Sequence, residues 1–116
     1  MSEATDATID RATFAELQEA AGADFVKDLV QTFLEEAPLM LKALRDALTA
    51  GDGDAFRRSA HSLKSNSLTF GALPLGAMAR ELELGGFDAA RRADVLDALD
   101  AEYARVAITL AELAHA

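Results

Sequence analysis

The sequence of 116 residues contains no cysteine and only two prolines. Without cysteine, a disulfide framework, a cysteine-ligated metal site and thiol catalysis are all excluded. No apolar run reaches the roughly 20 residues that a membrane-spanning helix requires. The first ten residues, MSEATDATID, lack the basic and apolar regions of a signal peptide. We therefore expect a cytoplasmic protein.

Positive charge is also scarce in this chain. Eleven Lys and Arg residues stand against twenty Asp and Glu residues, which gives a formal net charge of −9 at pH 7. The average field of such a chain repels polyanions, so we expect neither nucleic acid nor an anionic membrane among its partners. Hydrophobic residues make up 51% of the sequence. This share is enough to bury one core, and we predict a single globular domain.

The apolar residues recur at three- and four-residue spacing, and no segment alternates as a β-strand does. Pro38 lies inside one apolar pattern, where we expect it to kink or break a helix. Gly71 is placed to end a helix in the left-handed conformation, and Asp88 is placed to cap the last helix. The predicted helices cover about residues 10–22, 23–50, 54–70, 74–84 and 88–114.

Short connections between long amphipathic helices favour antiparallel neighbours. We therefore predict an all-α fold, an up-down antiparallel four-helix bundle with a short extra N-terminal helix. This bundle is expected to span residues 9–116 and to follow a flexible N-terminus of residues 1–8. We expect a monomer, because the last helix shows one apolar stripe and the core already needs it.

His61 is the first candidate for chemistry. A helical wheel places it about 140° from the centre of the apolar stripe of its helix, so it faces outward. Arg57 lies one turn before it, and Lys64 and Ser65 lie one turn after it. Nearby cations favour the neutral, nucleophilic imidazole and can hold the oxygens of a phosphoryl group, while a small Ser65 leaves room for a partner. A plain surface histidine on a solvated helix face is the alternative interpretation.

The segment HSLKSNSLTFGA, residues 61–72, and the LPLGAMARELE after it resemble the signature of histidine-containing phosphotransfer (HPt) domains. That pattern is roughly His, any residue, Leu, Lys, Gly, a small residue, Ser, three variable residues, Gly and Ala. A helix that ends in Leu-Glu follows it. FLEEAP, residues 33–38, and FRRSA, residues 56–60, also suit the family. The residues that match the pattern are His61, Leu63, Lys64, Ser67, Gly71, Ala72, Leu82 and Glu83.

The resemblance covers about residues 10–114, and it implies that this chain is an intermediate of a bacterial two-component phosphorelay. His61 would be the phosphorylated nucleophile, and Lys64 would be the electrostatic partner of the phosphoryl oxygens. The phosphoryl group would come from the aspartyl phosphate of a receiver domain and would pass to or from another response-regulator receiver. Ser65 departs from the family, which usually has glycine there, and this affects the expected rate of transfer more than the function.

The implied partners are receiver domains, with a hybrid histidine kinase as a further candidate. The sequence has no Gly-rich phosphate loop, so we expect a phosphocarrier without ATP-dependent kinase activity of its own. We expect no cofactor in this chain, and magnesium would be supplied by the receiver. We also expect no metal site, since only two histidines are present and no metal-binding motif assembles the carboxylates.

Hairpin geometry suggests a role for Glu83. Gly71 is ten residues after His61 and twelve before Glu83, so the two side chains should lie at about the same level of adjacent helices. Glu83 would then accept a hydrogen bond from the imidazole and fix its tautomer. A surface pair between Glu83 and Arg80 is the alternative.

We take Arg57, Ser65 and Leu68 as the candidate partner-binding residues. Leu68 lies one further turn past Lys64, where it would form part of an apolar docking surface. A position half-buried between two helices is the other interpretation of Leu68. The rival function for the whole chain is a helical-bundle adaptor that binds a receiver or a histidine kinase and modulates it without carrying phosphate.

Overall fold

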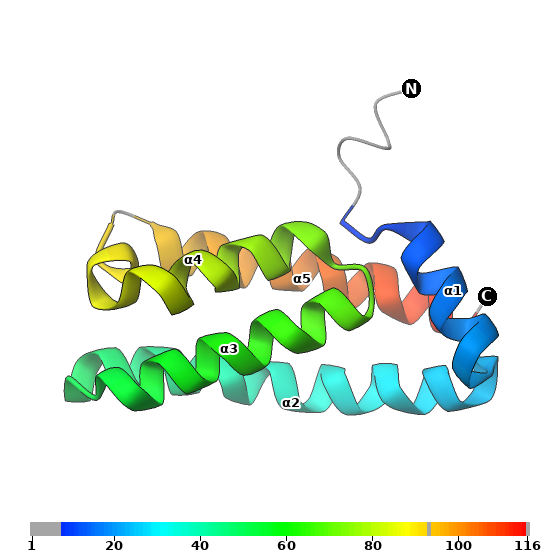
Figure 1. Cartoon of the computed structure of the whole chain (residues 1–116), viewed down its shortest axis with the longest axis horizontal. Helices are drawn as coiled ribbons and strands as arrows, with labels where there is room; N and C mark the ends of the chain where they lie inside the picture. Colours follow the sequence, from blue (N-terminus) through cyan, green and yellow to red (C-terminus); the bar gives the residue numbers. More distant parts are fainter. Residues whose placement is uncertain (1–7, 93, 116) are drawn as a thin grey trace, which may run out of the picture.

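In the computed structural model, residues 8–92 and 94–115 are described. This part of the chain forms five helices and no strand, which confirms the predicted all-α class (Figure 1). The predicted flexible N-terminus falls, apart from residue 8, outside the described residues. No helix in the described part is long and apolar enough to cross a membrane. The helices are α1 (Arg11–Ala21), α2 (Ala23–Ala50), α3 (Gly53–Thr69), α4 (Leu73–Ala90) and α5 (Val95–Ala114).

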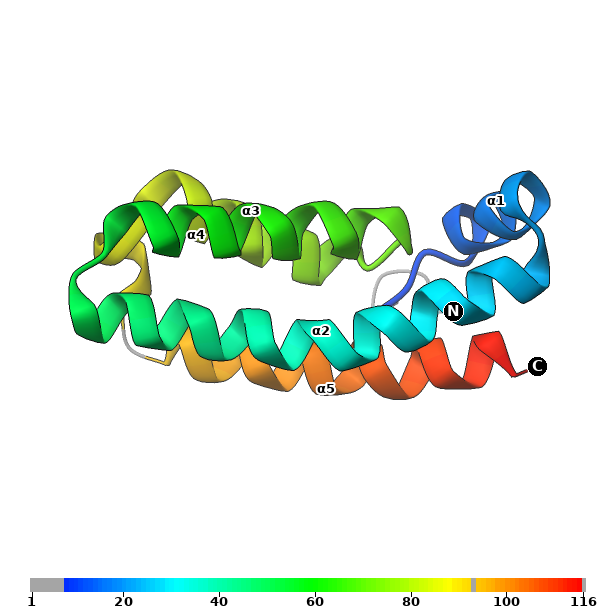
Figure 2. The same ribbon diagram turned by 90° about the horizontal axis from the view of Figure 1, so that it is seen from below.

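The four long helices lie lengthwise, and α1 lies across the end of the bundle at which α5 finishes (Figure 1). Helix α3 packs against α4 and α2, and α5 packs against α2 and α4. Figure 2 shows the same arrangement, with α2 beside α5 and α3 beside α4. All five helices contribute to one core, whose larger members include Phe14, Phe33, Leu44, Phe56, Leu63, Leu75, Leu82, Leu99 and Leu110.

Helix α2 is continuous through Pro38, so the predicted break does not occur. The ring of Pro38 lies on the exposed side of the helix, and the preceding Ala37 is completely buried. Apolar residues on the inner face pack against α3 and α5 on both sides of the proline. This packing holds the helix together despite the backbone hydrogen bond that proline cannot make.

The last helix begins later than predicted, and Asp88 does not cap it. The chain leaves helical geometry at Gly86 (φ 61°, ψ −145°), makes a further helical turn, and enters α5 only after Asp94. The extra turn is held by Phe87, whose ring packs edge-on against Phe56 at 5.4 Å between centroids. The helix thus leaves helical geometry at Gly86, close to its predicted end at residue 84, and a further helical turn follows.

Gly71 forms the turn between α3 and α4 with φ 82°, in the left-handed region as predicted. Its carbonyl oxygen accepts a hydrogen bond of 2.7 Å from the backbone N–H of Asp10, just before α1. A Cβ at position 71 would lie 2.8 Å from the carbonyl oxygen of Asp10. The turn therefore needs glycine both for its conformation and for the close approach of the chain.

Gly71→Ala is expected to lower the free energy of unfolding by about 2 kcal/mol or more, because it combines left-handed strain with a backbone clash. Gly51→Ala is the matched control, since Gly51 also has a positive φ, 73°, but its added Cβ would meet nothing within 4 Å. Urea unfolding of the two variants measures the difference. If Gly71→Ala is no less stable than Gly51→Ala, the close contact with Asp10 has no energetic importance.

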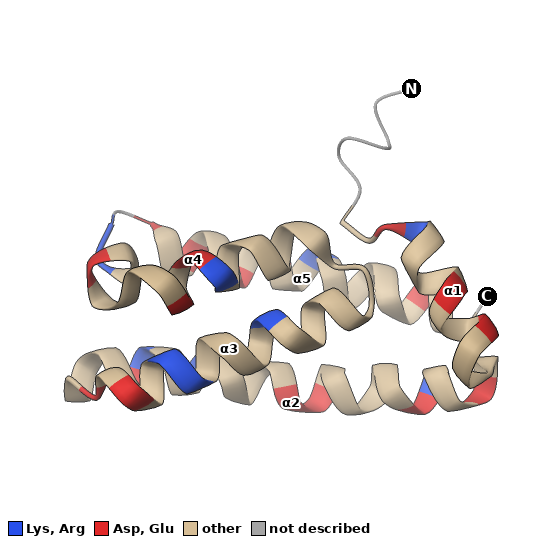
Figure 3. Ribbon diagram, viewed as in Figure 1, with Lys and Arg blue, Asp and Glu red and all other residues tan. Residues whose placement is uncertain are grey.

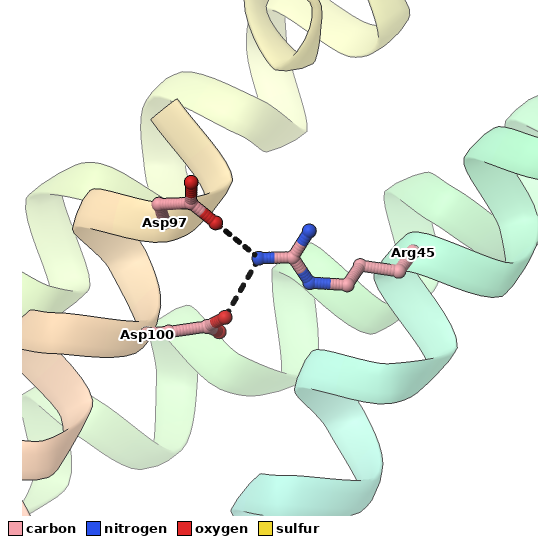
Figure 4. A network of polar contacts seen from close by, with 3 residues as sticks. All are labelled: Arg45, Asp97 and Asp100. Carbon is pink, nitrogen blue, oxygen red and sulfur yellow. Dashed lines mark hydrogen bonds and ion pairs between the residues drawn. The ribbon is translucent and has the colours of Figure 1, made fainter. Parts of the chain in front are cut away.

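A polar contact ties α2 to α5 at the surface (Figure 4). Nη2 of Arg45 donates to Oδ1 of Asp97 at 3.1 Å and to Oδ2 of Asp100 at 2.7 Å. These hydrogen bonds, led by that to Asp100, raise the pKa of Arg45. The three side chains are 44% to 77% exposed, so solvent screens the interaction and it adds little to stability.

Candidate functional site

The outward position of His61 follows from the way α3 is anchored. Asp52 caps the start of the helix, where its Oδ1 accepts a backbone hydrogen bond from the first turn. The inner face of α3 is buried through Phe56, Ala60 and Leu63. His61 therefore points away from the core, and 58% of its side chain is exposed.

Glu83 of α4 lies beside His61 and also beside Lys64. Nδ1 of His61 is 2.8 Å from Oε2 of Glu83, and Nζ of Lys64 is 2.8 Å from Oε1 of the same carboxylate. Only 17% of the Glu83 side chain and 22% of the Lys64 side chain are exposed, so both are sheltered in the groove of the α3–α4 hairpin. The contact expected from the hairpin spacing is present, whereas Arg80 makes no ion pair with Glu83 among the described residues.

The carboxylate defines which nitrogen of His61 is available. A carboxylate only accepts hydrogen bonds, so Nδ1 must carry the proton and donate it to Glu83. In the neutral ring, Nε2 then keeps its lone pair. The two ring nitrogens point in widely divergent directions, and Nε2 is therefore directed away from Glu83 and α4. This arrangement holds an exposed imidazole whose second nitrogen has a free lone pair.

Two of the cations near His61, Arg57 and Lys64, are balanced by carboxylates. Nη2 of Arg57 is paired with Oδ1 of Asp54 at 3.0 Å, and Lys64 is paired with Glu83. The ring itself contacts an anion and not a cation. The basic residues inferred from the sequence therefore lie near His61, but the charges of Arg57 and Lys64 are neutralised by carboxylates of the same chain.

The pKa of Glu83 lies below its ordinary value of 4.5, chiefly because of its contact with Lys64 and secondly because of its contact with His61. Folding thus favours the ionised form of this carboxylate. A group of this kind stabilises the fold fully above its unfolded pKa, and the stabilisation is lost as the pH falls through the lowered value. The contribution of Glu83 is therefore complete above about pH 4.5 and declines only below it.

Glu83→Gln is expected to make the stability of the protein less sensitive to acid below pH 4.5. The variant lacks the charge whose protonation weakens the hairpin in the wild type. Urea unfolding at about pH 6 and about pH 3 measures the loss for each protein. Glu81→Gln, at an exposed position of the same helix, is the control for removal of one negative charge. Equal losses in the wild type, Glu83→Gln and Glu81→Gln would contradict the stabilising role of the Glu83 contacts.

The other predicted site residues lie at different distances from this centre. Ser65 is exposed on the next turn of α3, where its carbonyl oxygen accepts a hydrogen bond of 3.0 Å from the Thr69 hydroxyl. Leu68 is 43% exposed, yet its side chain also lies against Gly76, where an added Cβ would come within 2.6 Å of Cδ2. Leu68 therefore combines the two positions expected for it, an exposed surface and a contact between α3 and α4.

The sequence did not identify every residue around His61. A shallow hollow beside the imidazole is lined by Arg57, Arg58, His61, Ser62 and Glu83. Arg58 and Ser62 were not predicted, although their places three residues before and one residue after His61 put them on its flank. The described residues include no group of three or more His, Asp or Glu side chains that could hold a metal ion.

The fold and the site together define a helical bundle in which an exposed histidine, His61, contacts an acidic side chain of the neighbouring helix. The family model of the Hpt domain matches residues 28–116, and the chain belongs to this family. The chain thus has a histidine phosphotransfer role in a two-component phosphorelay. Hpt proteins are phosphocarriers rather than kinases, and Hpt domains interact with receiver domains and kinases.

The structure is similar to the crystal structure of histidine-containing phosphotransfer protein B (HptB) from Pseudomonas aeruginosa PAO1. The TM-score is 0.84 at 30% sequence identity, and the likeness covers 94% of this chain and 96% of that chain. No curated protein matched the sequence. The resemblance inferred from residues 61–72 is therefore confirmed at the level of the family.

Proposed function

We propose that His61 carries the phosphoryl group, accepts it from the aspartyl phosphate of a receiver domain and passes it to the aspartate of another. The observation that carries this proposal is the contact of 2.8 Å between Nδ1 of His61 and Glu83, which leaves Nε2 as the nucleophile. Positioning and charge stabilisation dominate phosphoryl transfer, so a bundle that offers one oriented imidazole is sufficient.

In the transfer step, the lone pair of Nε2 attacks phosphorus and the bond from phosphorus to the aspartate oxygen breaks. The aspartate leaves as a carboxylate, and Nδ1 of His61 keeps its proton throughout. The phosphorylated ring then bears a positive charge, which faces Oε2 of Glu83. Glu83 is therefore both a positioning residue and a counter-charge for the product, and attack on Nε2-bound phosphorus by a second receiver aspartate reverses the same step.

Lys64 is the proposed electrostatic partner of the phosphoryl oxygens. It lies one helical turn after His61, and its ammonium group is held at 2.8 Å on the far oxygen of Glu83. A phosphoryl group on Nε2 adds negative charge beside this ammonium group. The ammonium group of Lys64 then interacts with both Glu83 and the phosphoryl group. Its charge-assisted contacts to the phosphoryl oxygens lower the energy of the transition state for transfer.

The remaining features of the proposal concern the chain as a whole. It acts as a cytoplasmic monomer, without enzymatic activity and without a cofactor of its own, and the receiver supplies magnesium and the acidic pocket. Nucleic acid and membranes are not partners, in keeping with the net charge of −9. The finer architecture is an up-down antiparallel four-helix bundle with an extra N-terminal helix, supported by the short turns that join successive lengthwise helices (Figure 1).

The experiment that tests the proposal is transfer of labelled phosphate from a phosphorylated receiver to the wild type and to His61→Gln. Labelling of the wild type alone supports His61 as the carrier, and equal labelling of both proteins contradicts it. The adaptor that binds a receiver without carrying phosphate is not favoured, because the family match assigns a phosphotransfer role.

A further inference from the structure

A small cavity lies between α4 and α5, at the end of the bundle where the chain passes from one helix to the other. It is partly enclosed, and its volume is about 120 Å³. None of its lining residues lines the hollow beside His61, so it is separate from the phosphotransfer site. The cavity is lined by Met78, Glu81, Leu82, Ala89, Arg92, Val95, Ala98 and Leu99.

The interior of this cavity is apolar. Leu82, Ala89 and Leu99 are buried, and the other apolar lining residues continue the same surface outward. Protein interiors leave few voids larger than a water molecule. An apolar cavity of about 150 Å³ stays free of water and binds benzene. A space of about 120 Å³ is therefore large enough for an apolar group slightly smaller than benzene, such as a branched aliphatic side chain.

Small side chains leave this space open. The chain leaves helical geometry at Gly86 and makes a further helical turn that carries Ala89 to the cavity. Ala98 borders the cavity from α5. Each alanine contributes only a methyl group, so a larger side chain at either position would occupy the space.

Two opposite charges lie at the rim of the cavity. Glu81 on α4 and Arg92 after it are both exposed, and neither makes an ion pair among the described residues. The neighbouring Arg91 is engaged elsewhere, with its Cζ 5.3 Å from the centroid of the Phe87 ring. Figure 3 shows acidic and basic residues together around the connection between α4 and α5. The rim therefore offers one negative and one positive charge to a ligand.

We propose that this cavity binds a free amino acid with a branched apolar side chain, such as leucine. The side chain fills the apolar interior, the ammonium group pairs with Glu81, and the carboxylate pairs with Arg92. A carboxylic acid without the ammonium group pairs with Arg92 but is repelled by Glu81, and the corresponding amine has the opposite defect. Binding at this site requires neither His61 nor its phosphorylation.

The test is an NMR titration of the 15N-labelled full chain with L-leucine. We expect saturable shifts of the backbone amides that border the cavity, with a dissociation constant of about 1 mM or below, as is ordinary for a ligand of this size. The deaminated analogue 4-methylpentanoate and the decarboxylated analogue 3-methylbutylamine should each bind about tenfold more weakly, because each lacks one ion pair. Glycine, which has no side chain to fill the cavity, should cause no saturable shifts.

Matched variants locate the binding. Ala98→Leu is expected to abolish leucine binding, because the added side chain fills the cavity. Ala101→Leu is its control, since Ala101 is exposed on the same helix and does not line the cavity, and this variant should bind as the wild type does. Arg92→Gln should weaken leucine binding about tenfold, whereas Arg91→Gln should leave it unchanged.

The proposal is overturned if leucine causes no saturable shifts, or if Ala98→Leu binds leucine as tightly as Ala101→Leu. Equal affinity for leucine and 4-methylpentanoate would also overturn it, because recognition would then not involve Glu81. Arg92 is exposed, so Arg92→Gln is expected to fold as the wild type does, and unchanged leucine binding by this variant would contradict the proposed ion pair.

Discussion

His61→Gln is expected to abolish acceptance of a phosphoryl group from any phosphorylated receiver. Glutamine has no nitrogen lone pair that can attack phosphorus, so the covalent step cannot occur at this position. The fold should be intact, because the side chain of His61 is 58% exposed and its loss leaves the core unchanged. The measurement is labelled phosphate retained by the chain after it is mixed with a phosphorylated receiver.

The chemistry of the label provides a second criterion. Phosphate on a histidine nitrogen is lost in acid and survives in base, so the wild-type label should show this pattern. His115→Gln is the matched control, since His115 is the other of the two histidines and lies exposed at the end of α5. We expect His115→Gln to accept label at the wild-type rate and to release it to a second receiver. Label on His61→Gln, or loss of label in His115→Gln, would contradict the account.

Lys64→Gln is expected to slow transfer from a phosphorylated receiver about a hundredfold, which is typical of the loss of one group that stabilises charge in a transition state. The substitution removes the ammonium group from the phosphoryl oxygens. It also leaves the carboxylate of Glu83 without its partner at 2.8 Å, so an uncompensated negative charge then lies near the incoming phosphoryl group. Rapid mixing with a phosphorylated receiver, sampled at early times, measures the rate.

Two further variants separate these causes. Lys42→Gln removes a lysine that is 72% exposed and paired with Asp46 on α2, and it should leave the rate unchanged. The double variant Lys64→Gln/Glu83→Gln removes the uncompensated carboxylate as well. If it transfers faster than Lys64→Gln, the difference in rate measures the repulsion between that carboxylate and the phosphoryl group. A wild-type rate in Lys64→Gln would show that the ammonium group takes no part in the transfer.

Local signals in the sequence were sufficient for the parts of the fold that depend on periodicity and turn chemistry. The apolar spacing of α3 placed His61 outward, and the left-handed turn at Gly71 placed Glu83 at the level of His61 on the next helix. Both inferences need only the number of residues per helical turn and the number of residues on each side of the turn at Gly71. The contact between His61 and Glu83 follows from them.

The predictions that failed depend on tertiary packing. Asp88 has the chemistry of a helix cap, but the packing of Phe87 against Phe56 extends the preceding helical segment past it. Of the kink or break expected at Pro38, the break does not occur, because burial of its neighbours keeps α2 continuous. Long-range apolar contacts outweighed local propensity in both places.

A groove between α2 and α3, lined in part by Leu39 and Arg58, could not be predicted from the sequence for a different reason. Leu39 and Arg58 belong to helices whose relative rotation is set by the whole core, and no spacing along the chain brings them together. The pairing of Arg57 with Asp54 likewise depends on side-chain conformation. Sequence patterns could therefore identify the exposed histidine and the carboxylate that contacts it, but not the surface around them.

The most direct test of the central claim is the site of phosphoryl attachment, measured by NMR on protein labelled with 15N in its two histidines. Glu83 holds Nδ1 of His61, so the account predicts that phosphorus couples to Nε2 of His61 while Nδ1 keeps its proton. Phosphorus bound to Nδ1 of His61, or to His115, would contradict it.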